Sequence, residues 1–357
     1  MALGVMAGLW PLHPRSLCAG FCGCERVLKA EREQSAVSRP AIAFKECNTM
    51  QEDVETLLNE VKEHYDHPLE VDISGEASGV LTHDQSHQQL KKDGTLVVAV
   101  TDTTNVDYTL SHELLHLLFQ MKGYPQLQFH LLSGDPQVDD QLYATSTSLY
   151  NAAVHMLVVA WQRDHNLLTD AAVAQVLAGF KQNVPAEADD QLVIYRVLSL
   201  LDLLGFLNGE LPAELANAYP QALPLARELY DLLDAQKLDS PFGLRRAVVH
   251  LLARFDTVIE RLGYQPTNDA EFATLTPVLS HRQLRLTLDQ VFMIKHSGYR
   301  DRETKEPAYV AMGRSDEQNA FVLPLPEKET TPEAFQQLYQ QSLNDILTQY
   351  RLDYTIR

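Results

Sequence analysis

The sequence predicts an α+β fold that is predominantly helical, and three features of its hydrophobic pattern predict this. Thr95–Val100 is a continuous run rich in β-branched residues, which is typical of a buried strand, and a helical pattern follows it after a short polar turn. Apolar residues then recur at helical spacing through most of residues 138–262. Short apolar runs of strand type return in the tail, which predicts a small C-terminal α+β unit over residues 275–357.

The same patterns predict the individual elements in order. An amphipathic pattern indicates a helix at 50–65, strict alternation indicates a strand at 69–73, and 75–81 is a candidate second strand. The polar stretch 85–92 is a candidate helix, and 95–100 is the clearest strand. The expected later helices are 109–122, 138–162, 170–182, 190–207, 220–236, 243–262 and 331–350. The expected strands of the tail are 290–294, 308–312 and 321–323.

Composition and charge limit the partners of the protein. The chain has 357 residues, of which 45% are hydrophobic and 22% charged, as in ordinary globular proteins. Its formal net charge is -19, which argues against nucleic acid, because phosphate binding needs clustered Lys and Arg. It also argues against docking on anionic lipid, and no run after the N-terminal segment is long enough to span a bilayer.

The first 49 residues differ from the rest of the chain. All four cysteines lie there, and the segment carries six Lys or Arg against four Asp or Glu. Ala2–Trp10 is apolar, but no basic residue precedes it and prolines interrupt the region that follows, so it does not resemble an export signal. We expect a disordered, atypical extension and a cytoplasmic location for the protein. One hypothesis is that Met50 is the native start and that the earlier residues are an upstream extension.

An HExxH pentapeptide, His112-Glu113-Leu114-Leu115-His116, lies in the first half of the 109–122 helix. Two histidines four residues apart on a helix point the same way and can bind one metal ion. Glu113 lies one step round the helix, where it can take a proton from a water held by that metal. The alternative, a pair of core histidines, is less favourable, because buried imidazoles and a buried carboxylate each need polar partners. We therefore predict Zn²⁺ bound by His112 and His116, with Glu113 as general base.

A catalytic zinc site takes three protein ligands and leaves one position for water, so a third ligand is needed. We predict His155, because Asn151 lies one turn before it on the same face of an apolar helix and can hydrogen-bond the ligand to hold its ring. The alternatives are Asp140 and Asp139, either of which would make a His-His-carboxylate site. Each of these three residues also has a simpler explanation. His155 could be a core histidine whose hydrogen bonds are satisfied, and Asp139 and Asp140 could be acids that the helix dipole favours in a first turn.

Four further histidines precede the motif, and two of them, His83 and His87, are four residues apart. A second metal site among them is possible in principle. We expect them instead to be solvent-facing side chains. The members of this group are His64, His67, His83 and His87.

The strand 95–100, the short turn and the helix segment Ser111–Phe119 resemble the core of zincin-like metallopeptidases, broadly of the gluzincin or ImmA/IrrE-like kind. This resemblance implies a small sheet beside the HExxH helix, with His112 and His116 as zinc ligands and Glu113 as base. It also implies a Glu or Asp ligand from a following helix, although no Glu occurs between Glu113 and Glu187.

The resemblance and the patterns together divide the chain into four predicted regions. These are the extension 1–49, a zincin-like metal-binding core at 50–165, a helical region at 166–270 and the C-terminal unit at 275–357. The function expected is that of a zinc-dependent metallopeptidase, a hydrolase whose partner is a peptide or protein substrate held by strand addition. The alternatives are a non-catalytic regulatory or binding protein on a zincin-like scaffold, and a helical interaction protein with an accidental motif.

Overall fold

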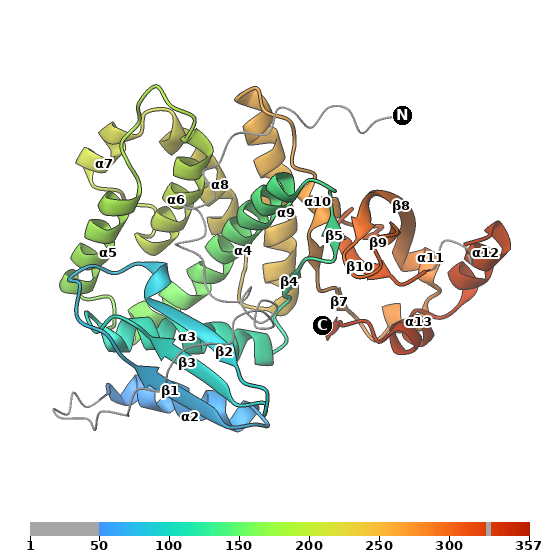
Figure 1. Ribbon diagram of the computed structural model, residues 1–357, viewed down its shortest axis with the longest axis horizontal. Helices are drawn as coiled ribbons and strands as arrows, with labels where there is room; N and C mark the ends of the chain where they lie inside the picture. The colour runs from blue at the N-terminus through green and yellow to red at the C-terminus, as the bar shows by residue number, and fades with distance from the viewer. Residues whose placement is uncertain (1–49, 326–329) are drawn as a thin grey trace. The chain divides into compact units, whose positions relative to one another are not determined.

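The structure is a computed structural model that describes residues 50–325 and 330–357 (Figure 1). Helix predominates over strand in this part of the chain, so the predicted α+β class is confirmed. The expected extension 1–49 and the proposed start at Met50 concern a segment outside the described residues. Among the described helices, none combines the length and the apolar character that crossing a membrane requires.

Contacts gather the described residues into two units. The first, here called the HExxH unit, contains residues 50–121 and 158–185. The second, here called the larger unit, contains residues 122–157, 186–325 and 330–357. The predicted division at residues 165 and 275 follows sequence pattern rather than contacts, and it stays a prediction.

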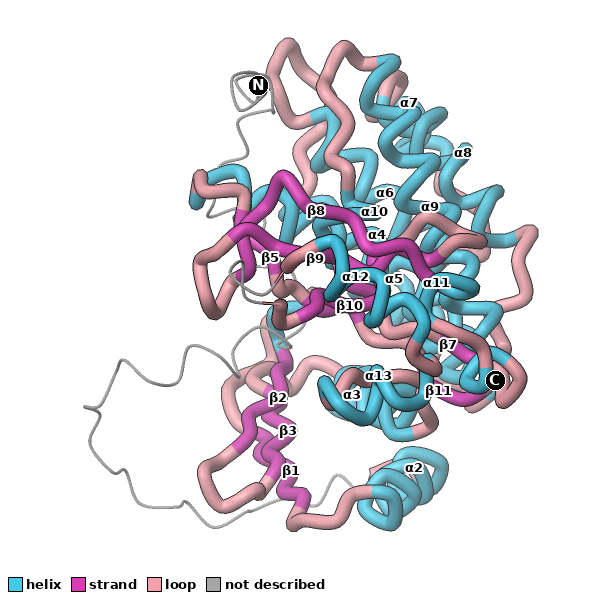
Figure 2. Tube along the Cα trace, turned by 90° about the vertical axis from the view of Figure 1, so that its right-hand side faces the viewer, coloured by secondary structure: helices cyan, strands magenta, loops and turns pink. Residues whose placement is uncertain are grey.

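A three-stranded sheet forms the base of the HExxH unit, in the order β1 (Leu69–Ile73), β3 (Leu96–Val100), β2 (Ser86–Leu90). β1 runs parallel to β3, and β2 runs antiparallel to it. β3 is buried along its whole length, because it has a strand on either side, which explains its continuous apolar run. Helices α2 (Glu52–His64) and α3 (Val106–Met121) lie on the same side of this sheet (Figure 2).

Two predictions for the segment between β1 and β3 are wrong. The candidate strand 75–81 is a loop, in which Gly75 and Gly79 adopt φ of 84° and 83°, a conformation that favours glycine. The candidate helix 85–92 is instead β2, preceded by the short 3₁₀ helix η2 (His83–Gln85). β2 is an edge strand, so its side chains are not required to be apolar, and the hydrophobic pattern that reveals central strands is missing.

Helix α3, which carries the HExxH motif, begins three residues earlier than the sequence predicted. The Asn105 side chain accepts a hydrogen bond from the backbone N–H of Tyr108 at 3.2 Å and so occupies one of the free donors of the first turn. The helix is buried almost all round its first three turns, which agrees with its apolar sequence. The motif is therefore held in the interior of the unit and not on a mobile surface segment.

The HExxH unit is completed by two segments that follow much later in the chain. The last residues of α4 (Pro136–Asp164) belong to it, and Gln162 donates from there to the Tyr108 carbonyl and the Ser111 hydroxyl, both at 2.9 Å. Helix α5 (Asp170–Asn183) packs against the loop before β2, where the Leu81 N–H donates to the Gln175 carbonyl. The α4 contacts therefore hold α3, which carries the motif, and the α5 contact holds the loop that leads to β2.

Gly179 allows α5 to approach this loop closely. A Cβ at that position would lie 2.3 Å from the Leu81 carbonyl oxygen, a backbone atom that cannot easily move. We expect Gly179→Ala to lower the free energy of unfolding by about 1–3 kcal/mol through overpacking, more than the ~1 kcal/mol that alanine gains in helix propensity. Urea denaturation measures this. Gly205→Ala in helix α6 (Val193–Phe206) is the control, since its Cβ would meet only the flexible Met156 side chain at 3.4 Å. An equal loss of stability in both variants would contradict the prediction.

The larger unit combines a helical part with strands whose pairs are antiparallel, except for one short parallel pair near the C-terminus. Its sheet has the order β10-β9-β8-β5, and two small sheets pair β11 with β7 and β4 with β6. Besides the first part of α4, its helices are α6 (Val193–Phe206), α7 (Ala213–Ala218), α8 (Ala222–Asp234), α9 (Pro241–Arg261), α10 (Asp269–Phe272), α11 (Leu288–Val291), α12 (Pro332–Gln340) and α13 (Leu343–Tyr350), with the 3₁₀ helix η3 (Gln283–Arg285). Its strands are β4 (Leu127–Gln128), β5 (Leu131–Leu132), β6 (Thr274–Leu275), β7 (Val278–Leu279), β8 (Phe292–Asp301), β9 (Pro307–Gly313), β10 (Asn319–Leu323) and β11 (Thr355–Ile356).

Most of the long elements predicted for this unit are confirmed, and the last helix is corrected. The predicted helix 331–350 is two helices, α12 and α13, that separate at Gln341 and Ser342. The Ser342 hydroxyl accepts from the Asp345 N–H at 3.2 Å and caps α13, and the Leu288 N–H donates to the Gln341 carbonyl. These bonds satisfy the backbone groups that a helix break exposes, so the break costs little.

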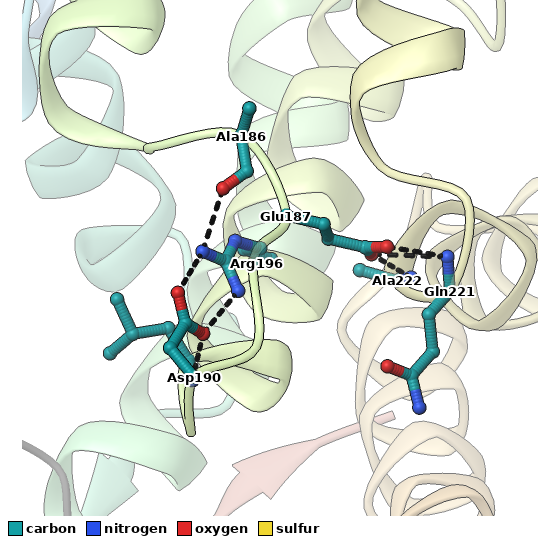
Figure 3. A network of polar contacts seen from close by, with 7 residues as sticks. Ala186, Glu187, Asp190, Arg196, Gln221 and Ala222 are labelled. Carbon is teal, nitrogen blue, oxygen red and sulfur yellow. Dashed lines mark hydrogen bonds and ion pairs between the residues drawn. The ribbon is translucent and has the colours of Figure 1, made fainter.

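A buried arginine fixes the loop before α6 (Figure 3). Arg196 is 1% exposed, and its guanidinium makes two hydrogen bonds of 2.7 Å to the Asp190 carboxylate, which hold the pKa of Asp190 down to about 2. The neighbouring Glu187 accepts hydrogen bonds from the N–H groups of Gln221 and Ala222 at the start of α8. A carboxylate there also complements the helix dipole, so one short loop ties α6 to α8.

Asp269, at the start of α10, is the most deeply buried acid of the larger unit with a raised pKa. Burial, and then the charge of Asp256, raise the pKa of Asp269 to about 7. One carboxylate oxygen accepts from the Ser146 hydroxyl at 2.9 Å. The pKa of Asp256 is itself raised by burial, so both of these neighbouring acids bind a proton more readily than exposed carboxyl groups do.

This raised pKa makes stability depend on pH. Between about pH 4 and pH 7 the folded protein keeps a proton on Asp269 that the unfolded chain releases. The contribution of Asp269 to the free energy of unfolding is therefore full below pH 4 and is lost as pH rises through 7. We expect Asp269→Asn to reduce the fall in unfolding free energy over this range by an amount on the order of 4 kcal/mol. Denaturant titrations at several pH values measure it, with the exposed Asp140→Asn as control. Parallel pH curves for Asp269→Asn and the unmodified protein would contradict the prediction.

Candidate metal centre

His112 and His116 lie one helical turn apart on α3 and direct their rings toward one another. Their Nε2 atoms are 3.2 Å apart, and their ring centroids are 4.8 Å apart. Two imidazole nitrogens bound tetrahedrally to one zinc ion, each at 2.0–2.1 Å, would be separated by about 3.3 Å. The donor geometry therefore fits a zinc ion, and in its absence the same distance allows one ring to donate a hydrogen bond to the other.

His83 is a third histidine beside this pair in the same unit. It begins η2, and its ring centroid lies 5.5 Å from that of His112. One ring nitrogen of His83 lies within 4.8 Å of a ring nitrogen of His112. His83 and His116 are half-buried while His112 is buried. The expectation of solvent-facing histidines agrees with the exposed His64 and His67, whereas His83 is half-buried beside His112.

Glu113 is fully buried and is held by the edge strand. One oxygen accepts a hydrogen bond from the Ser86 hydroxyl at 2.8 Å, and the other accepts from the Gln88 side-chain amide at 3.1 Å. Ser86 and Gln88 are two residues apart on β2, so both point to the face that packs on α3. Each carboxylate oxygen retains lone-pair capacity for a further donor such as a water molecule.

His155, the predicted third ligand, is buried in the larger unit. Its Nδ1 atom lies 2.6 Å from a carboxylate oxygen of Asp202 on α6, a bond that fixes the ring orientation and the role of the other nitrogen. Histidines that bind metals commonly have a carboxylate in this position. Its assignment as a ligand stays a prediction, as does the role of Asn151, which is buried one turn earlier on α4.

The two alternative ligands lie at the other end of α4. Asp140 is exposed, while Asp139 is buried and accepts a hydrogen bond from the Ser133 N–H at 2.6 Å. Fifteen residues separate Asp140 from His155, which is about 22 Å along a helix. One metal ion therefore cannot bind both of these side chains.

Sequence reasoning missed Ser86 and Gln88 beside Glu113, and Asp202 beside His155. It named His83 but expected that side chain to face solvent. The two β2 residues carried a usable signal, because they alternate along a short polar segment as edge-strand residues do. Asp202 carried another, since it is the single acid in the apolar helix α6. Nothing local in the sequence indicated that His83 lies near His112, because this proximity depends on how the loop before β2 folds back onto α3.

Comparison of this chain with protein-family models, with curated proteins and with solved structures gave no match. The functional argument therefore depends on the geometry of the site.

The contacts of Glu113 generate a stability prediction. We expect Gln88→Ala to lower the free energy of unfolding by about 1–3 kcal/mol, because it removes a donor from a buried carboxylate. Gln89→Ala, at the next and exposed position of β2, is the matched control and should change stability by less than about 0.5 kcal/mol. Chemical denaturation measures both variants, and equal effects would show that Glu113 gains nothing from Gln88.

Proposed function

We propose that the protein is a cytoplasmic zinc-dependent peptidase with a zincin-like core, which hydrolyses peptide bonds in a peptide or protein substrate. The observation that carries this proposal is the 3.2 Å separation of the His112 and His116 Nε2 atoms, which suits two ligands of one zinc ion. A sheet edge beside the motif helix supports it further, because an exposed strand edge can hold an extended peptide. The acidic chain is not expected to take nucleic acid or an anionic membrane as its partner.

Each residue of the motif has a role in this proposal. His112 and His116 hold the metal, with His155 as the ligand that the sequence predicts in addition. Zinc bound there would polarise the scissile carbonyl and bring the pKa of a coordinated water near 7. Glu113 accepts the proton of the attacking water and returns it to the leaving amine. Ser86 and Gln88 orient the Glu113 carboxylate for this transfer.

A second candidate is a non-catalytic binding protein on the same scaffold. The observation in its favour is that both oxygens of Glu113 are already engaged by β2, as expected of a carboxylate with a purely structural role. The two candidates differ in what removal of the Glu113 charge does: it abolishes hydrolysis in a peptidase and leaves partner binding intact in a binding protein.

The first test is metal content. We expect one zinc ion per chain by elemental mass spectrometry of the purified protein, and its loss in His116→Ala. His64→Ala, an exposed histidine on α2, is the matched control and should retain the metal. A wild-type chain that binds no zinc at micromolar concentration would refute the proposed metal centre.

The second test separates the two candidates. We expect Glu113→Gln to keep zinc but to lower the cleavage rate of a mixed peptide library by about 100-fold or more, the usual contribution of a general base. Mass spectrometry of the cleaved library measures this. Equal product from the wild-type and Glu113→Gln proteins, or none from either when zinc is bound, would contradict the peptidase and favour the binding protein.

A further inference from the structure

His83 belongs to a turn that the HExxH unit holds in place on several sides. Within η2, the Gln85 side chain accepts from the Thr82 N–H at 3.0 Å, completing a capping box. The Gln85 amide donates to the Val80 carbonyl at 2.9 Å, and the Gln85 carbonyl accepts from the Thr101 N–H at 2.8 Å. Gln85 is buried, so these hydrogen bonds are shielded from competition with water.

The same turn is anchored to the motif helix and to α5. Ser86 follows the turn directly and donates to Glu113, which joins it to α3. On its other side, the Leu81 carbonyl lies against Gly179 so closely that a Cβ would not fit. The His83 backbone is therefore fixed before any ligand arrives, so binding through its ring requires little further ordering of the chain.

His112 has two imidazole neighbours in this unit: its ring centroid lies 5.5 Å from that of His83, and its Nε2 atom lies 3.2 Å from that of His116. A neutral imidazole has one nitrogen with a lone pair that can bind a divalent cation, and imidazole is a preferred ligand of zinc. The His83 to His112 proximity adds to the 3.2 Å pair a third donor from a different element of the same unit.

We propose that His83 binds the same metal ion as His112 and His116, so that the HExxH unit supplies three imidazole ligands from its own residues. This inference rests on the metal centre of the proposed function. The ligand comes from before the motif, at the start of the edge strand, whereas the family resemblance implies a ligand from a later helix. Three protein ligands leave a position for water or for one further donor.

The strand provides a matched control. Ser86 and Gln88 both contact Glu113, so His87 between them projects from the opposite face of β2. His87 is half-buried like His83 and lies four residues from it, yet it cannot reach the α3 side of the sheet. Replacing His83 or His87 by alanine in the full chain removes an imidazole at nearly the same point of the sequence, so the two variants differ mainly in which face of the unit loses it.

Zinc affinity, measured by competition with a chromophoric chelator, tests the proposal. We expect His83→Ala to weaken zinc binding by at least about 100-fold, beyond the usual effect of residues that only support a ligand, and His87→Ala to change it by less than about threefold. His83→Asp keeps a metal-binding side chain and should recover part of the affinity. With Co²⁺ in place of zinc, His83→Ala should alter the visible absorption spectrum while His87→Ala leaves it unchanged. Circular dichroism establishes that each variant is folded.

The outcomes separate this inference from the proposed function. If folded His83→Ala binds zinc like the wild-type protein while His116→Ala does not, His83 is not a ligand and the metal centre stands. If His83→Ala loses affinity and His83→Asp recovers none of it, the role of His83 is structural and the inference is overturned. If the wild-type protein binds no zinc, both proposals fail.

Discussion

The contact on which the HExxH unit depends is the hydrogen bonding of one buried carboxylate. Glu113 has no access to solvent, and a buried carboxylate needs hydrogen-bond donors from the protein. It takes them from Ser86 and Gln88 on β2, and this choice sets where the edge strand lies along α3. The position of η2, and with it the position of His83, follows from that register. A single acid thus links the motif helix, the sheet edge and the third imidazole.

The interior around the motif is more polar than its sequence suggests. α3 reads as an apolar helix, yet Ser111, His112 and Glu113 are all buried in it. Each has a polar neighbour from another element: Gln162 donates to Ser111, His83 lies against His112, and β2 binds Glu113. A buried polar residue stabilises a fold only when its partners are present, so these contacts also make the unit specific for one arrangement of its elements.

The sequence predicted the elements that have a regular hydrophobic period and failed where partners decide the structure. β3 and the long helices bury apolar faces, so their residues recur at a fixed spacing that can be recognised along the chain. β2 is polar because it lies at an edge, and the split between α12 and α13 depends on a serine cap and on backbone bonds to Leu286 and Leu288. For the candidate site, spacing alone led to the prediction of His112, Glu113 and His116. It could not identify His83 or Asp202, because each meets its partner only after folding.

The HExxH unit is discontinuous in sequence, and this determines when it can form during synthesis. Residues 50–121 leave the ribosome before Gln162 and Gly179, which complete their packing and follow only after the segment 122–157. At a usual elongation rate of roughly 5–20 residues per second, the sheet and α3 wait for several seconds with their buried faces incomplete. During that interval the nascent chain exposes the apolar surface of α3 and an unprotected strand edge, so chaperone engagement is expected there before any other stage of biogenesis.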